Sequence, residues 1–143
     1  MTPGRAITRD RSFILLSYLL VGIGGAIGSV ARFWMSGLIA TRFGQTFPLG
    51  TLVVNVTGSF VIGLFAALSE AEGRWLVNPS FRQFFMIGVC GGYTTFSSFS
   101  LQTLALVREG EWFHAVTNSI ASFALCLFAV WLGYFTIALI TKP

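Results

Sequence analysis

The sequence predicts an all-α membrane protein whose four transmembrane helices form a single domain over residues 1–143. Its composition is the first reason: 55% of the residues are hydrophobic and 10% are charged, against about 25% charged in an average soluble domain. The second reason is the presence of four stretches without any charge, residues 12–31, 43–69, 83–107 and 112–141. A helix needs about 20 residues to cross about 30 Å of hydrocarbon, so each stretch is long enough to span a membrane.

These stretches place the helices at about residues 12–40, 47–69, 82–107 and 112–140. The first helix continues past Arg32, which either ends it or is carried into the membrane interface. Small residues on this helix recur at the spacing of close packing, since Gly24 and Gly28 are four residues apart. Such pairs let the backbones of neighbouring helices approach, so we expect the first helix to pack tightly against another span.

Uncharged polar side chains recur at helical spacing in two of the predicted spans. The second helix carries one at every fourth position: Thr51, Asn55 and Ser59. The fourth helix has the same spacing: Asn118, Ser122 and Cys126. Facing each other, the two stripes would form a path of polar groups, whereas the alternative is that they simply join packed helices by hydrogen bonds. Asn55 favours the path, because an amide near mid-span is costly to leave unpaired.

The third helix contains a segment of poor helix propensity, Gly91-Gly92-Tyr93-Thr94-Thr95. An unwound segment at membrane depth is tolerated only where protein or a bound ion satisfies the freed carbonyls. We therefore predict that the third helix is broken mid-membrane and that the break holds a cation. The alternative is an uninterrupted helix whose glycines serve packing.

Two phenylalanines follow this segment directly. Phe96 and Phe99 are three residues apart and therefore share a helix face. Aromatic rings have an electropositive edge, so two edges aimed into a pore would receive a small anion without a fixed positive charge. Core packing is the alternative in a chain with fifteen phenylalanines.

The predicted spans lack the groups that other functions require. All acids lie in the flanks or loops, so a proton-coupled transporter has no intramembrane carboxylate. The lone His114 is expected at the membrane interface, and no Walker loop, metal-ligand cluster or Ser/His/Asp set is present. With Lys142 as its single lysine, the chain has little to offer nucleic acid. We expect no enzyme, no nucleotide and no nucleic-acid partner.

Basic residues in the loops predict the orientation. Six arginines and lysines share one side, and the other side has two, Arg42 and Arg108. The six are Arg5, Arg9, Arg11, Arg74, Arg82 and Lys142. The positive-inside rule therefore favours both termini in the cytoplasm.

Three motifs occur in order along the first three predicted helices. They are Gly24-Gly25-Ala26-Ile27-Gly28 through Arg32, Gly50-Thr51-Leu52-Val53-Val54-Asn55, and Gly91-Gly92-Tyr93-Thr94-Thr95-Phe96-Ser97-Ser98-Phe99-Ser100. These motifs resemble the signatures of the Fluc (CrcB) fluoride channel family, and the similarity covers about residues 17–135.

The resemblance implies an antiparallel, dual-topology homodimer of four-helix subunits in the bacterial plasma (inner) membrane. It also implies two fluoride pores, a central structural sodium ion, and passive fluoride efflux that lowers cytoplasmic fluoride and protects the cell. Dual topology requires that the chain insert nearly equally in both orientations. The charge bias of six to two favours one orientation instead. We give the motifs more weight than the charge count, because the bias depends largely on Arg5, Arg9 and Arg11, which precede the first predicted helix.

The resemblance further assigns roles to residues of this chain. By motif position, the backbone carbonyls of Gly91 and Thr94 would bind sodium, and Arg32 would be structural or act on the electrostatics of a vestibule. The fluoride pore would contain Phe96, Phe99, Asn55, Thr51, Ser122 and Asn118. Two of the positions depart from the pattern, because Gln102 stands where some members carry glutamate and Asn118 where some carry tyrosine.

Two other classes remain open at this point. A four-helix multidrug or small-molecule exporter has similar size and hydropathy, but it should carry a carboxylate within the first helix, which residues 12–31 lack. A non-transporting subunit of a membrane assembly would not need two aligned polar stripes.

Overall fold

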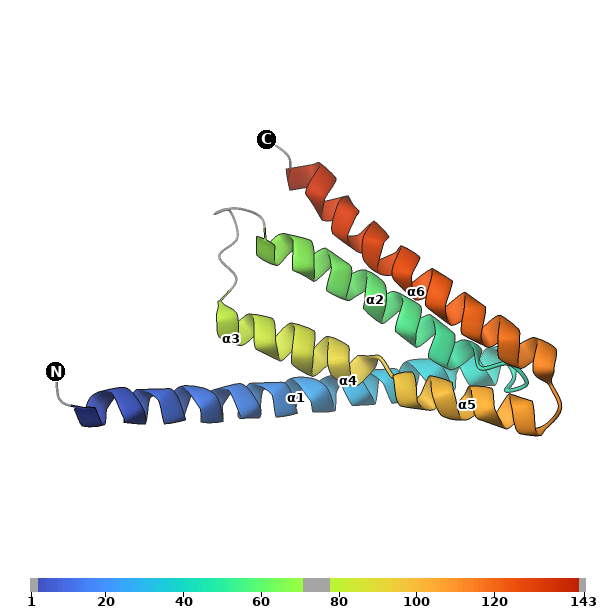
Figure 1. The fold of residues 1–143 in the computed structure, drawn as a ribbon, viewed down its shortest axis with the longest axis horizontal. Helices are drawn as coiled ribbons and strands as arrows, with labels where there is room; N and C mark the ends of the chain where they lie inside the picture. Colours follow the sequence, from blue (N-terminus) through green and yellow to red (C-terminus); the bar gives the residue numbers. More distant parts are fainter. Residues whose placement is uncertain (1–2, 71–77, 142–143) are drawn as a thin grey trace.

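The computed structural model describes residues 3–70 and 78–141, all in helices or the short segments between them. The helices are α1 (Pro3–Phe43), α2 (Leu49–Glu70), α3 (Pro79–Arg82), the π-helix η1 (Gln83–Cys90), α4 (Gly91–Tyr93), α5 (Phe96–Arg108) and α6 (Trp112–Thr141). Figure 1 shows α2 beside α6, and α1 alongside the segment from α3 to α5. The two pairs of helices converge at the end where the α1–α2 and α5–α6 connections lie.

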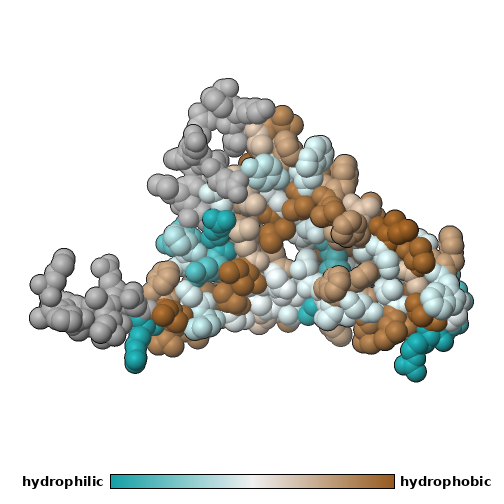
Figure 2. Space-filling model, in the orientation of Figure 1, coloured by the Kyte–Doolittle hydropathy of each residue, from teal (hydrophilic) through white to brown (hydrophobic). Residues whose placement is uncertain are grey.

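Four parts of the described chain are long and apolar enough to cross a membrane. They are Arg11–Phe43, Leu49–Ser69, Pro79–Arg108 and Trp112–Ile140. Few side chains are buried within the single subunit, and apolar side chains cover much of the surface in Figure 2. The prediction of a multi-pass, all-helical membrane protein is confirmed. The helix α1 begins before the expected residue 12, because charged residues limit how much of a helix lies in lipid but do not end the helix.

Two glycines end helices and thereby set the direction of the next span. Gly44 follows α1 with a φ of 81°, and Gly110 follows α5 with a φ of 80°. After α5, the Gly110 amide donates to the Val107 carbonyl at 3.1 Å and the Glu111 amide to the Leu106 carbonyl at 2.9 Å. This is the hydrogen-bond pattern of a Schellman motif, in which the left-handed residue is usually glycine. The helix α6 can therefore start at once and return across the membrane.

Glycines also form the contact between α1 and the third span (Pro79–Arg108). A Cβ atom added at Gly28 would collide with the Val89 carbonyl, and one added at Gly92 with the Gly25 carbonyl. The expectation that Gly24 and Gly28 permit close packing is confirmed, since both face the third span backbone. The helices α2 and α6 approach equally closely at Gly63 and Gly133, where an added Cβ atom would collide with the backbone of the other helix.

The third span is interrupted, as expected, but the break is narrower than the predicted segment. Gly91–Tyr93 is helical, and only Thr94 and Thr95 have extended backbones, with ψ angles of 156° and 113°. The prediction that the two glycines are unwound is therefore wrong. Gly92 serves the contact with α1, which low intrinsic propensity does not prevent. No local pattern in the sequence predicts the π-helix before the break.

Candidate functional site

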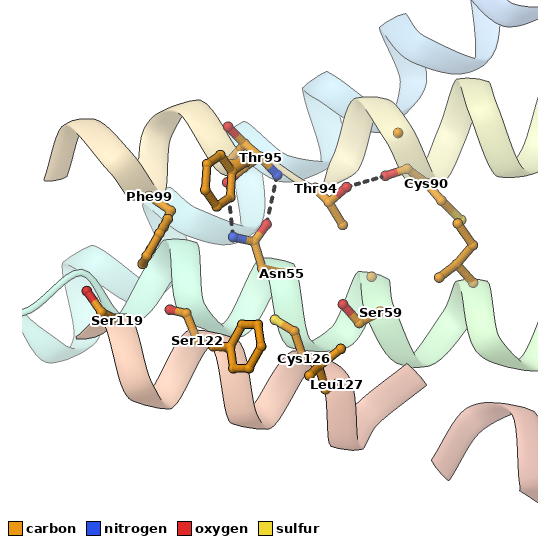
Figure 3. A pocket seen from close by; sticks show the side chains of 15 residues that line it. Asn55, Ser59, Cys90, Thr94, Thr95, Phe99, Ser119, Ser122, Cys126 and Leu127 are labelled. Atoms are coloured by element: carbon orange, nitrogen blue, oxygen red, sulfur yellow. Dashed lines mark hydrogen bonds between the residues drawn. The ribbon is translucent and has the colours of Figure 1, made fainter. Parts of the chain in front are cut away.

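Asn55 of α2 holds the break in the third span. Its amide nitrogen donates to the Thr95 carbonyl at 3.0 Å, and its amide oxygen accepts from the Thr95 backbone N–H at 2.7 Å, as drawn in Figure 3. The side chain therefore replaces the helical partners that Thr95 lacks. An asparagine amide has two N–H groups, so one remains for a further acceptor.

Thr95 begins the second half of the span as the N-cap of α5. Its hydroxyl accepts from the Ser98 backbone N–H at 3.1 Å and donates to the Ser98 hydroxyl at 3.0 Å. Capping of this kind satisfies one of the free amides at a helix start, where the helix dipole is positive. The start of α5 thus lies at the break, with Phe96 as its first residue.

The carbonyls predicted to bind sodium are partly released from helical bonding. The Thr94 amide donates to the Cys90 carbonyl at 3.0 Å, but the next amide, of Thr95, donates to Asn55 instead of Gly91. The Gly91 carbonyl therefore does not receive its usual helical donor. Neutral carbonyl oxygens are hard ligands that suit an alkali ion. Within the described residues there is no group of three or more His, Cys, Asp or Glu that would suit another metal.

Arg32 of α1 reaches the same break from the other side. Its guanidinium Nη1 lies 3.4 Å from the Thr94 carbonyl oxygen, to which it donates. Arg32 also lines a cavity of about 430 Å³, which we call the Arg32 cavity. The other residues of this cavity are Ser29, Phe33, Ser36, Thr51, Thr95, Ser98 and Gln102.

A second cavity of about 480 Å³ lies between α2, the third span and α6, and we call it the break cavity. Figure 3 shows side chains from all three spans around this space. Its polar lining comes from Asn55, Ser59, Thr94, Thr95, Ser119 and Ser122. Its remaining lining includes Phe96, Phe99, Phe123, Leu127, Cys90 and Cys126.

The two predicted pore phenylalanines lie at this cavity. Their ring centroids are 5.4 Å apart with the ring planes inclined at 44°, so they share a helix face as expected. Phe99 is half-buried, whereas Phe96 is 79% exposed in the single subunit. Phe96 therefore forms part of an open side of the cavity.

The two polar stripes meet only in part. Asn55 and Ser59 share the break cavity with Ser122 and Cys126, as the facing arrangement predicts. Thr51 is buried and lines the Arg32 cavity instead.

Asn118, the first member of the stripe on α6, does not line the break cavity. It is 1% exposed and donates to the Thr103 hydroxyl of α5 at 2.8 Å. The Thr103 hydroxyl in turn donates to the Phe99 carbonyl at 2.8 Å. Asn118 therefore joins α6 to the helix that carries Phe99, which is the packing role that the alternative reading proposed.

Two buried polar atoms at these cavities have no protein partner. The Ser122 hydroxyl is one, in a residue that is 8% exposed. The other is the Oε1 atom of Gln102, which lines the Arg32 cavity. Buried polar groups are normally hydrogen-bonded, so each of these positions has the capacity to contact water or a ligand.

Sequence reasoning missed two residues of the site. Thr95 holds the break and caps α5, and the pattern Thr95-Phe96-Ser97-Ser98 after a helix interruption is a detectable N-cap signal. Thr103 gives no local signal, because its partner Asn118 lies on another helix.

Four membrane-spanning segments, one of them interrupted beside a cavity with unpaired polar groups, are typical of channels and transporters. Comparison with known proteins is more specific. The family model described as CrcB-like protein, Camphor Resistance (CrcB), matches residues 19–134. The chain belongs to this family, as its three motifs indicated.

Curated relatives support the same assignment over most of their length. A protein of Rhodospirillum rubrum is 55% identical over 127 residues, which cover 89% of this chain and 98% of the relative. A protein of Opitutus terrae is 61% identical over 117 residues, covering 82% and 89%. A protein of Paramagnetospirillum magneticum is 53% identical over 128 residues, covering 90% and 100%. Each relative is named fluoride-specific ion channel FluC.

Proposed function

We propose that this protein is a fluoride-selective channel through which fluoride leaves the cell passively. Membership of the CrcB family and the names of its relatives support the assignment. The observation that carries the mechanism is the break cavity, where Asn55 keeps one free N–H and Ser122 has an unpartnered hydroxyl. Both are donors that have no protein acceptor and line this cavity.

Donors at this depth replace the water that fluoride must shed. Fluoride is small and tightly hydrated, so its entry into a dry path requires hydrogen-bond donors to offset dehydration. Asn55, Ser122 and the edges of Phe96 and Phe99 supply them in the break cavity. The ring edges contribute weaker contacts, which let the ion leave again.

Thr51 and Gln102 extend this path toward the Arg32 cavity, because both line it. The amide of Gln102 is neutral, so it does not repel an anion as a carboxylate at this position would. Arg32 contributes positive charge beside the same cavity and fixes the break through the Thr94 carbonyl. Asn118 acts on the path through Thr103 and the backbone of Phe99.

The membrane potential drives the flux without ATP. With the cell interior negative by about 100 mV, anion exit is favoured by about 2.3 kcal/mol per charge. A narrow path excludes larger halides, and the positive ring edges disfavour cations. Export of this kind lowers cytoplasmic fluoride and protects the cell.

The functional unit in this proposal is an antiparallel homodimer. The break cavity is lined by three spans and is open beside Phe96, which a single subunit leaves exposed. A second copy in the opposite orientation would close this side and complete two equivalent paths.

The sodium ion would lie where the two breaks meet. One subunit offers the carbonyls of Gly91 and Thr94, and the opposed subunit would add the same pair, giving four neutral oxygens. The ion would satisfy backbone carbonyls that the break releases, so its role is structural.

Efflux from liposomes tests the assigned transport. Purified protein should release fluoride when valinomycin and potassium provide charge balance, and it should release chloride far more slowly. Equal fluoride and chloride fluxes would contradict fluoride selectivity. A fluoride flux that requires an imposed proton gradient would indicate a coupled transporter instead.

A further inference from the structure

A third cavity, of about 530 Å³, lies at the end of the molecule where the α1–α2 and α5–α6 connections meet, and we call it the mouth cavity. It adjoins the Arg32 cavity, because the two cavities have four lining residues in common: Phe33, Ser36, Thr51 and Gln102. Thr95 in turn lines both the Arg32 cavity and the break cavity. The three cavities therefore form a series that leads from the break to the end of the subunit.

Two glutamates carry the only charges among the described residues that line the mouth cavity. Glu109 is the C-cap of α5, and Glu111 lies in the short connection between α5 and α6. Both residues are exposed, and a glutamate side chain carries a negative charge at neutral pH. The next cavity inward contains the positive charge of Arg32. An anion that moves along the series thus meets a positive charge inside and two negative charges at the mouth.

The carboxylate of Glu111 is held beside the mouth cavity by His114 of α6. The Nδ1 atom of His114 lies 3.1 Å from the Oε2 atom of Glu111. The His114 ring packs edge-on against Phe47, with the ring centroids 6.0 Å apart, and Phe47 lines the same cavity. These contacts keep the negative charge of Glu111 at a defined place on the rim.

The charge of Glu109 is not cancelled by a direct contact. Within the described part of the chain, no Lys, Arg or His forms an ion pair with Glu109. Its position at the end of α5 adds the negative end of the helix dipole to that of the carboxylate. Arg42 and Arg108 lie at the ends of α1 and α5, but neither lines the mouth cavity.

We propose that fluoride leaves the Arg32 cavity through the mouth cavity, and that Glu109 and Glu111 limit the rate of its passage by repelling it there. The inference rests on the proposed function, because it adds two rate-determining residues to the same fluoride path. A unit charge about 10 Å from an anion in water lowers the local anion concentration about twofold, so two such charges lower it about fourfold. Salt removes this effect, since the Debye length falls from about 30 Å at 0.01 M to about 3 Å at 1 M.

The test measures fluoride efflux from liposomes by the full-length wild type and by the double variant Glu109→Gln/Glu111→Gln. Efflux is measured at one pH and at ionic strengths of about 0.01 M and about 1 M. N-methylglucamine gluconate on both sides sets the ionic strength, so that the sodium, potassium and fluoride concentrations stay the same. The double glutamine variant should release fluoride about two to four times faster than the wild type at low ionic strength. At high ionic strength the two rates should converge.

A second variant separates charge from structure. Glu109→Asp/Glu111→Asp retains both negative charges, so its dependence on ionic strength should follow that of the wild type. Size-exclusion profiles should be normal for both double variants, because both substituted residues are exposed.

Three results would overturn the proposal: an unchanged or lower rate of the glutamine variant at low ionic strength, the same rate change at both ionic strengths, or a rate increase in the aspartate variant equal to that in the glutamine variant. The second and third would indicate a structural effect of the substitutions. A wild type that releases no fluoride at either ionic strength would refute the proposed function, and this inference with it.

Discussion

Asn55 is the side chain on which the break in the third span depends most directly. It makes two hydrogen bonds to the backbone of one residue, Thr95, and so acts as a template for an extended segment inside the membrane. The same amide retains one N–H toward the break cavity. A structural role and a role in ion binding are therefore combined in one residue.

Replacing Asn55 with leucine should abolish fluoride efflux and lower stability. Leucine has similar volume but leaves the Thr95 amide and carbonyl without partners, at a cost of about 1–3 kcal/mol for each buried group. Fluoride efflux and thermal unfolding in detergent measure the two effects. The matched control is Ser59→Ala, one turn along α2 at the same cavity, which should conduct nearly as the wild type does. Normal efflux by folded Asn55→Leu would contradict the assigned role.

At this scale the sequence predicted the residues that the two polar stripes contain, but not all of their partners. Helical spacing is enough to bring Asn55 and Ser122 to one cavity. It does not reveal that Asn118 bonds to Thr103, since that contact depends on how α5 and α6 pack after the Gly110 turn. Tertiary packing decides which polar residues are free for a ligand and which are used between helices.

At the scale of the helices, close contact between α1 and the third span fixes the position of the break. Gly28 lies against the backbone of Val89 and Gly92. The Arg32 guanidinium, one turn further along α1, reaches the Thr94 carbonyl. The glycine contact thus sets how far Arg32 is from the break.

Gly28→Ala should therefore weaken the protein much more than an alanine elsewhere on the same helix. Its Cβ would collide with the Val89 carbonyl, and backbone shifts of this kind cost about 1–3 kcal/mol. Gly22→Ala is the control, because no atom lies within 4 Å of the added Cβ. There, higher helix propensity should leave stability unchanged or raise it by up to about 1 kcal/mol. Thermal unfolding of both variants checks this, and equal melting temperatures would refute it.

The break shows what local sequence signals can and cannot predict about an element. Low helix propensity correctly predicted an interruption near Gly91 and Thr95, but it misplaced the unwound residues. Gly91–Tyr93 stays helical because tertiary contact, rather than propensity, determines the state of Gly92. The interruption falls instead at two β-branched residues, where Asn55 satisfies the backbone.

The whole molecule leaves an extensive apolar surface and a cavity open beside Phe96. Length, composition and charge spacing were sufficient to predict four spans, because the bilayer fixes the length of each helix. The same features do not determine how subunits pair. Two of the residues in the orientation count, Arg74 and Lys142, lie outside the described residues.

Orientation in the membrane distinguishes the two readings of the loop charges. In an antiparallel dimer, single-cysteine reporters at the N-terminus, introduced into a variant lacking Cys90 and Cys126, should be labelled from both membrane faces. An impermeant thiol reagent added to one side and then to both sides measures this. Labelling only from the cytoplasmic face would support the positive-inside count and exclude dual topology.

In the proposed mechanism, fluoride passes through the break cavity along the edges of Phe96 and Phe99. The most direct test is fluoride efflux by Phe96→Ile and Phe99→Ile, with Phe123→Ile as the control at the same cavity. Each change keeps most of the apolar volume and should cost less than about 1.5 kcal/mol of stability, so size-exclusion profiles should stay normal. We expect efflux to collapse in the first two variants and to persist in Phe123→Ile. Near-normal efflux by folded Phe96→Ile and Phe99→Ile would show that the ion path runs elsewhere.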